Sequence, residues 1–236
     1  MVTCLSVALG LFVGAGKLAE PVTHDALQAA LAQEASGDDA AATLALEAVV
    51  RTEPSSSLAH LELGRLLLKQ GRNLQGAGYH LDIACALAPE NPRGQYLQGL
   101  YQEEQGRFAQ ATRAFEHAVA LRPEDAEARS RLASLALRRD DAAGAIEQLE
   151  VLKRLQPTQV SVRLLLAQAR EKARDIPGAE RELVSLRAEH PKAPSTLRAL
   201  ADFYARTHRP LLAERLRREQ PGPAQRHLRT LPKSSR

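Results

Sequence analysis

The feature that most constrains the fold of this chain is the recurrence of two residue types at one interval. Five prolines recur at a nearly constant spacing: Pro54, Pro89, Pro123, Pro157 and Pro191. Five alanines recur at a constant spacing of the same size: Ala77, Ala111, Ala145, Ala179 and Ala213. Two independent residue types that share a period of about 34 residues indicate an internal repeat, in which each unit is a small element that packs on the next.

Composition indicates that these units are helical. Ala, Leu, Arg and Glu dominate the 236 residues, and all four favour helices. Aromatic residues make up only 3% of the chain. No segment alternates β-branched and aromatic residues with polar ones, which is the pattern of a half-buried strand. We therefore predict an all-α fold.

The third repeat unit, residues 92–125, shows the pattern most clearly. Gly106 is placed to end a first helix, because a left-handed residue after a helix is easiest for glycine. Pro123 ends the second helix, since proline lacks the N–H that would continue it. Phe115 is predicted to fill the space between the two helices. Small residues are expected where helices approach closely: Gly99, Ala111 and Ala118.

A helix–turn–helix unit of this period with these residues resembles the tetratricopeptide repeat family. The resemblance covers about five-sixths of the chain, and the second repeat unit carries one extra residue near Asn73. It implies a right-handed α-solenoid, in which a concave wall of first-helix side chains binds partner peptides. The array spans residues 23–220 and has about six repeat units, the last of them incomplete: 23–56, 57–91, 92–125, 126–159, 160–193 and 194–220.

In this resemblance, the side chains that line the concave wall are the second, fifth, ninth, twelfth and thirteenth of each repeat unit. An apolar strip with charges at its edges suits an amphipathic helix or an extended apolar segment. The alternative is that some of the leucines pack against neighbouring helices. The predicted partner-binding residues are Leu58, Leu61, Arg65, Leu68, Lys69, Arg93, Tyr96, Leu100 and Glu103. The C-terminal half of the wall is more polar: Ser130, Ser134, Arg138, Gln168, Lys172, Arg198, Asp202 and Arg206.

The N-terminal residues 1–22 form an apolar segment. Residues 2–16 carry no charge, and no basic residue precedes Lys17. The segment is short for a membrane span, which needs about 20 residues, and it fits the apolar region of a signal peptide, about 7–15 residues long. We favour export to the periplasm or membrane attachment. The alternative is a cytoplasmic protein whose N-terminal helix packs on the first repeat.

Charge is unevenly distributed along the chain. The net charge is +4, yet residues 206–236 alone hold nine basic and two acidic side chains. The rest of the chain therefore carries a net charge of −3. We interpret residues 221–236 as a basic, disordered tail. The alternative is an arm for an acidic partner or an anionic membrane.

No motif indicates catalysis. Cys4 and Cys85 lie in no CxxC motif, so neither a disulfide framework nor a zinc site is supported. The chain has no GxSxG motif for a nucleophilic serine. Its seven histidines form no HExxH or other close metal-ligand pair in sequence: His24, His60, His80, His117, His190, His208 and His227. We predict no catalytic residue, no metal and no cofactor, and hence no enzyme.

These observations predict a non-catalytic scaffold or adaptor that binds a protein or peptide segment in its concave groove, with no small-molecule substrate. We place it in a bacterial envelope assembly. The alternative is a cytosolic scaffold that engages an acidic partner through its basic tail. Nucleic-acid binding is disfavoured, because the body of the chain is net acidic and aromatic side chains for base stacking are scarce.

Overall fold

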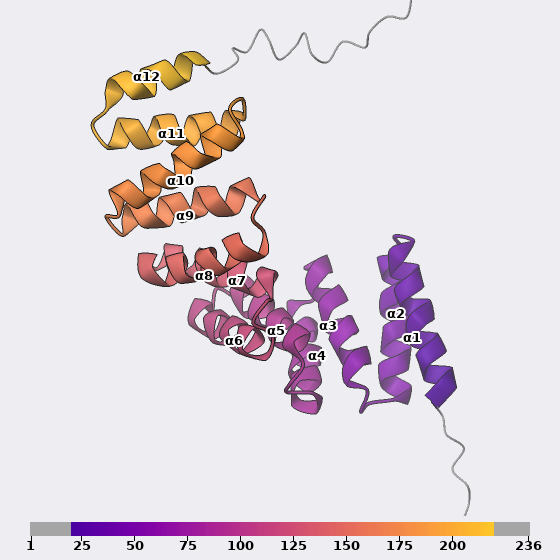
Figure 1. Ribbon diagram of the computed structural model, residues 1–236. Helices are drawn as coiled ribbons and strands as arrows, with labels where there is room; N and C mark the ends of the chain where they lie inside the picture. The colour runs from indigo at the N-terminus through magenta and orange to yellow at the C-terminus, as the bar shows by residue number, and fades with distance from the viewer. Residues whose placement is uncertain (1–19, 220–236) are drawn as a thin grey trace, which may run out of the picture. The chain divides into compact units, whose positions relative to one another are not determined.

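The computed structural model describes residues 20–219, which hold twelve α-helices and no strand (Figure 1). The predicted all-α fold class is confirmed. The predictions for the signal peptide or anchor and for the basic tail fall mainly on residues 1–19 and 220–236, outside this range. Over the described residues, no helix combines the length and the apolar character that a membrane span requires.

The helices are paired into six hairpins, and we call the first helix of each hairpin its A helix and the second its B helix. The A helices begin at nearly equal intervals from α3 onward. The hairpins are α1 (Glu20–Ala35) with α2 (Asp39–Thr52), α3 (Ser57–Gln70) with α4 (Leu74–Leu87), α5 (Pro92–Glu104) with α6 (Phe108–Leu121), α7 (Ala126–Arg138) with α8 (Ala142–Leu155), α9 (Val160–Lys172) with α10 (Ile176–Glu189), and α11 (Pro194–Arg206) with α12 (Pro210–Glu219).

Side-chain caps fix where most of the helices begin. Asn73 lies at the extra residue of the second repeat unit, and its Oδ1 accepts a hydrogen bond from the backbone N–H of Gly76 at 2.9 Å. Asp141 and Asp175 accept the equivalent bonds from Gly144 and Gly178. Each cap satisfies one of the backbone donors that a helix leaves unpaired in its first turn.

The turn inside each hairpin contains one residue in the left-handed backbone conformation. Glycine fills this place in the first three hairpins, and Gly106 has the expected positive φ of 71°. Asp140, Arg174 and His208 fill it in the last three hairpins, with φ of 58°, 65° and 59°. A left-handed conformation is costly for residues with a Cβ. The repeat geometry therefore imposes this turn even where the sequence lacks glycine.

The chain divides into two compact bodies between Ala88 and Pro89, which we call the N-terminal body and the C-terminal body. In the N-terminal body, α1 to α4 bury one apolar cluster, to which each helix contributes. Leu46 of α2 and Leu63 of α3 are fully buried in it. The partners of these large side chains include alanines, such as Ala77 of α4, which let the helices approach closely.

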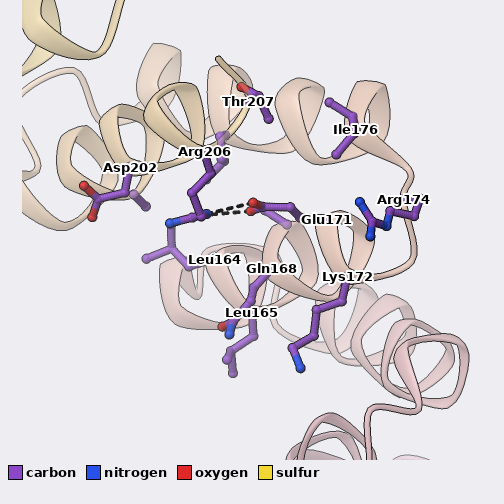
Figure 2. A pocket seen from close by; sticks show the side chains of 13 residues that line it. Leu164, Leu165, Gln168, Glu171, Lys172, Arg174, Ile176, Asp202, Arg206 and Thr207 are labelled. Carbon is purple, nitrogen blue, oxygen red and sulfur yellow. Dashed lines mark hydrogen bonds and ion pairs between the residues drawn. The ribbon is translucent and has the colours of Figure 1, made fainter. Parts of the chain in front are cut away.

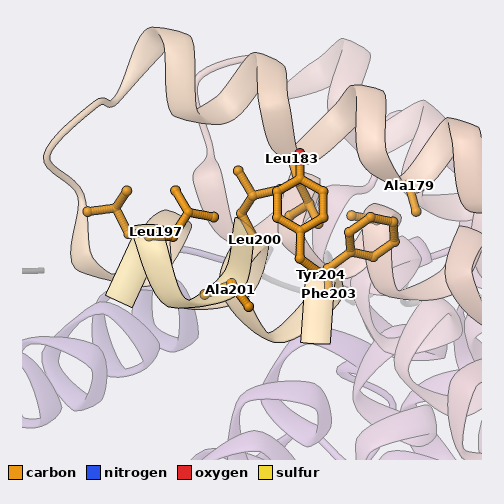
Figure 3. Packing of buried hydrophobic residues seen from close by; sticks show 10 residues of the cluster. Ala179, Leu183, Leu197, Leu200, Ala201, Phe203 and Tyr204 are labelled. Atoms are coloured by element: carbon orange, nitrogen blue, oxygen red, sulfur yellow. The ribbon is translucent and has the colours of Figure 1, made fainter. Parts of the chain in front are cut away.

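In the C-terminal body, α5 to α12 bury three such clusters in succession. Phe115 of α6 lies in the first cluster and is fully buried, as predicted. The last cluster is drawn in Figure 3, where Phe203 and Tyr204 of α11 lie close to Leu183 of α10. Because each hairpin packs mainly on its chain neighbours, this body is built from local contacts.

Candidate functional site

The C-terminal body contains a cavity of about 840 Å³ between α9, α10 and α11 (Figure 2). We call it the α9–α11 pocket. Its lining has an apolar part, formed by Leu164, Leu165, Ala167, Ile176, Leu183 and Ala199. A polar part completes it, formed by Gln168, Glu171, Lys172, Arg174, Asp202, Arg206 and Thr207. A few polar groups placed around an apolar surface are typical of sites that bind a ligand.

Helical spacing brings the α9 side chains of this pocket onto one face. Leu164, Gln168, Glu171 and Lys172 follow one another at intervals of four, three and one residues, so they share one side of the helix. They occupy the fifth, ninth, twelfth and thirteenth positions of their repeat unit. The lining positions that the sequence predicts for the concave wall therefore meet at this pocket.

The adjacent A helix contributes in the same way. Asp202 and Arg206 of α11 are at the ninth and thirteenth positions of the last repeat unit, and both line the pocket. Together with Gln168 and Lys172, they belong to the polar half of the wall predicted from the sequence. Arg198, another member of that half, is exposed on α11 and does not line the pocket.

An ion pair joins the two A helices across the pocket. Arg206 Nε donates to Glu171 Oε1 at 2.7 Å, and Arg206 Nη2 donates to Glu171 Oε2 at 2.9 Å. Figure 2 shows these two parallel bonds. The hydrogen bonds from Arg206 to Glu171 raise the pKa of the Arg206 guanidinium above its ordinary value. A two-pronged pair of this kind has a defined geometry, so it fixes the charged edge of the pocket.

Two other charged groups of the lining are also engaged. Lys172 Nζ pairs with Asp140, in the turn between α7 and α8. Asp202 Oδ1 lies 3.8 Å from Arg217 Nη2 of α12. The side chains of Gln168 and Arg174 differ from these, because neither has a hydrogen-bond or ion-pair partner within residues 20–219. The pocket thus offers one amide and one guanidinium that are available to a ligand.

Sequence reasoning missed Arg174. It lies beyond the last residue of α9, in the left-handed turn position that Gly106 fills two repeat units earlier. An arginine at a place where the repeat favours glycine is the signal that could have found it.

The partner-binding residues predicted in the N-terminal body have mixed environments. Leu58 is 48% exposed, whereas Leu61 is only 2% exposed and does not line an open surface. Leu68 is half-buried and packs against the apolar cluster of α1 to α4. The burial of Leu61 and Leu68 agrees with the alternative for these leucines, in which they pack against neighbouring helices.

The two basic residues predicted in this body belong to an ion cluster. Arg65 of α3 donates to Glu34 of α1 and, at 2.6 Å, to Glu62. Lys69 donates to Asp39 of α2 at 3.0 Å and to Glu34 at 3.2 Å. The hydrogen bond to Glu34 raises the pKa of Arg65, and the same bond lowers the pKa of Glu34. These side chains connect three helices of the N-terminal body.

The residues predicted on α5, in the C-terminal body, are similarly engaged. The ring of Tyr96 lies 5.7 Å from that of Phe115, and Leu100 packs against the same cluster. Glu103 pairs with Arg131 at 3.4 Å, and Arg93 is exposed in the first turn of α5. None of these α5 residues lines the α9–α11 pocket. Their partner-binding role, like that of the residues in the N-terminal body, stays a prediction.

The structure also brings together two histidines that are far apart in the sequence. His60 Nδ1 and His80 Nδ1 lie 3.0 Å apart across the α3–α4 hairpin, and His60 Nε2 lies 3.1 Å from the carbonyl oxygen of Pro54. His60 is buried, and burial lowers the pKa of His80, with a smaller contribution from His60. Among the described residues, no three side chains of His, Cys, Asp or Glu form a metal-binding group.

Helical hairpins that recur at one interval and pack on their chain neighbours define a class, the all-α helical-repeat proteins. A family model described as "Tetratricopeptide repeat" matches residues 26–92 and 96–160, which is more than half of the chain. The chain therefore belongs to the tetratricopeptide repeat family, as predicted. Members of this family are generally non-catalytic scaffolds that bind peptides or proteins.

Solved structures share this fold. A tetratricopeptide repeat protein from Parabacteroides merdae ATCC 43184 is 20% identical, with a TM-score of 0.67 over 85% of this chain and 80% of that one. PilF of Pseudomonas aeruginosa is 22% identical, with a TM-score of 0.65 over 89% and 97% of the two chains. YrrB, described as a TPR protein with an unusual peptide-binding site, is 15% identical, with a TM-score of 0.65 over 79% and 98%. A search of curated proteins returned no match.

Proposed function

We propose that this chain is a non-catalytic scaffold that binds a segment of a partner protein in the α9–α11 pocket. The observation that carries this proposal is the lining of the pocket, in which an apolar surface adjoins two polar side chains without partners among the described residues. A short peptide segment combines apolar side chains with backbone amides, so it matches both parts. The peptide-binding site described for YrrB is consistent with such a site on the shared fold.

The dimensions of the pocket agree with a short segment. A volume of about 840 Å³ lies within the range of about 300–1,000 Å³ that is usual for ligand sites. Gln168 is exposed in its lining, where its amide can donate to and accept from the backbone of a bound chain. The Glu171–Arg206 pair joins the two A helices before any ligand arrives, which reduces the ordering that binding must bring about.

Site-specific crosslinking tests the proposal in native cells. A photoreactive diazirine analogue of leucine replaces Leu165, which lines the pocket. Leu211 of α12 provides the matched control, because it is 81% exposed and does not line the pocket. We expect a partner adduct at position 165 that is absent at 211. An excess of wild-type chain should suppress this adduct, whereas an excess of Gln168→Trp chain, in which an indole replaces the amide that contacts the ligand and narrows the pocket, should not.

Two outcomes contradict this site. Equal adducts at positions 165 and 211 would indicate nonspecific contact. The same analogue is also placed at Leu58, an exposed residue of the predicted groove in the N-terminal body, and adducts there but not at 165 would place binding in that body. A deletion of residues 221–236 adds a further test. Loss of the adduct in that deletion, with a steep dependence on salt, would favour the alternative in which the basic tail engages an acidic partner.

We propose the compartment separately. Export to the periplasm, or attachment to a membrane as part of a bacterial envelope assembly, is supported by the uncharged residues 2–16. Fusion of residues 1–25 to a reporter that is active only after export tests this. A reporter that stays inactive, with the fusion protein found in the cytosol, would contradict it and leave the binding proposal unaffected.

A further inference from the structure

The charges around the α9–α11 pocket are not balanced. Its lining contains three cationic side chains and two carboxylates: Lys172, Arg174, Arg206, Glu171 and Asp202. Both oxygens of Glu171 accept hydrogen bonds from Arg206. Asp202 faces Arg217 at 3.8 Å, so each carboxylate of the lining already has a cationic neighbour. A cationic ligand would have to displace one of these arginines.

Arg174 differs from these carboxylates, because it forms no ion pair within residues 20–219. It is exposed, it lines the pocket, and its guanidinium has no partner among the described residues. Figure 2 shows it at one end of the group of lining side chains, with Leu164 and Asp202 toward the other end. A guanidinium presents a planar fork of donors that matches a carboxylate, and such charge-assisted bonds are stronger than neutral ones. A carboxylate is therefore the group that this side of the pocket is suited to bind.

The length of α9 between its apolar lining and Arg174 sets a distance. From Leu165 the helix runs seven residues to its end at Lys172, about 10 Å along the axis, and Arg174 lies just beyond that end. An extended peptide advances about 3.3 Å per residue. A chain with an aliphatic side chain on Leu164 and Leu165, held at its backbone by Gln168, would thus bring a side chain to Arg174 about three residues further on.

We propose that the segment bound in this pocket is extended and acidic, with an aliphatic side chain and, about three residues from it, a carboxylate that pairs with Arg174. This inference rests on the proposed function, because it assigns a chemistry to the ligand of that same site. The aliphatic side chain supplies buried apolar area, and the carboxylate supplies the orientation of the chain in the pocket.

Labelled peptide pools test this assignment by fluorescence anisotropy with the full chain. Each pool is a decapeptide with Leu fixed and, three residues away in either direction, Glu in one pool, Gln in the second and Lys in the third, while the other positions are mixed among Ala, Ser, Thr and Gly. We expect the Glu pool to bind about tenfold more tightly than the Gln pool, as one charge-assisted bond allows, and the Lys pool to bind most weakly.

Two matched variants locate the effect. Arg174→Gln should bring the Glu and Gln pools within about twofold of each other. Arg181→Gln removes the same charge from an exposed position of α10 outside the pocket, and it should keep the tenfold preference. Equal binding of both pools to the wild-type chain, or a preference that survives Arg174→Gln, would overturn the assignment.

The failure of this inference can be told apart from the failure of the proposed function. If Glu and Gln pools bind equally and Gln168→Trp abolishes both, the pocket binds peptides and only the carboxylate assignment is overturned. If the pools bind and Gln168→Trp changes neither, the pocket is not the binding site and both proposals are overturned.

Discussion

Gly99 shows how a single residue sets the spacing of a hairpin. A Cβ added at Gly99 would lie 2.5 Å from Cε1 of Phe115, a ring that is fully buried between α5 and α6. A buried ring has no free space into which it can move, so the helices would have to separate.

We therefore predict that Gly99→Ala destabilises the chain by about 1–3 kcal/mol, the usual cost of overpacking a core. Urea denaturation followed by circular dichroism measures the change. Arg113→Ala, at an exposed position of α6, should be nearly neutral and serves as the control. Equal stability of Gly99→Ala and wild type would contradict the close contact with Phe115.

The burial of His80, beside His60, predicts a dependence of stability on pH. Burial lowers the pKa of His80 in the folded chain below its ordinary value of 6.5. The unfolded chain therefore takes up a proton at this residue at a higher pH than the folded chain does, so stability falls as the pH drops below about 6.5. The loss stops growing once the pH is below the folded pKa.

Melting temperatures at about pH 7.5 and about pH 5.5, on either side of the ordinary histidine pKa, test this linkage. Wild type should lose more stability between these two values than His80→Asn, which has no group to protonate at this place. Because the other histidines are present in both proteins, the difference between them reports on His80. An identical loss in wild type and variant would show that the folded chain does not lower the pKa of His80.

Residues whose volume or backbone conformation the repeat requires were predictable from the sequence. Residues whose role depends on an ion pair with another helix were not. Gly106 and Phe115 were predicted because the repeat requires a particular volume or backbone conformation at those positions. The pair of Arg163 with Glu182 at 2.6 Å, buried between α9 and α10, was not predicted, because its members lie on different helices and share no sequence motif. Arg174 was missed for a similar reason, since it lies in a turn outside the helical pattern.

At the scale of the element, the hairpin turn is the place where this sequence fits the backbone geometry of the repeat least well. His208 adopts a φ of 59° between α11 and α12, a conformation that glycine adopts at little cost. Glycine at this place relieves the steric cost of the Cβ, while it makes the unfolded chain more flexible.

We predict that His208→Gly is stabilising by up to about 1 kcal/mol, because the left-handed conformation costs a residue with a Cβ about 1–2 kcal/mol. His208→Ala should bring no such gain, since alanine keeps the Cβ. Thermal melts of the two variants, at a pH where histidine is neutral, measure the difference. An alanine variant more stable than the glycine variant would show that the strain of the left-handed Cβ is smaller than the entropic cost of glycine, and a wild type more stable than both would show that the imidazole itself stabilises the turn.

The same scale explains which part of the candidate site was predictable. The register positions on α9 and α11 were predicted because helical spacing determines which side chains share a face. Leu61 was placed on the wall by the same rule, yet it is buried. The position of a residue in the repeat predicts the face of the helix on which its side chain lies. Whether that side chain is exposed depends on how the neighbouring helices pack on it, which the position alone does not determine.

At the scale of the whole molecule, the chain has two bodies with separate apolar clusters. We therefore predict that a substitution that destabilises one hairpin lowers stability mainly in that hairpin and its neighbours. A Cβ at Gly64 would lie 2.8 Å from Cγ of Leu81, so Gly64→Ala strains the α3–α4 hairpin. In a repeat protein, each hairpin depends on its nearest neighbours, and a local loss of stability decreases with distance along the array.

Amide hydrogen exchange on the full chain tests this. In Gly64→Ala, we expect faster exchange in α3 and α4, with no change in α9 to α11, and Gly99→Ala should shift the effect to α5 and α6. Faster exchange throughout residues 25–219 in either variant would mean that the whole chain opens as one cooperative body.

The α9–α11 pocket has a consequence for how such a chain can change over generations. Its lining residues come from two consecutive repeat units, 160–193 and 194–220, so each unit supplies one part of the pocket. A recombination event that replaces only the last unit would exchange Asp202 and Arg206 while keeping Gln168 and Arg174. The two parts of the ligand preference would then be inherited separately, one with residues 160–193 and the other with the shorter last unit, 194–220.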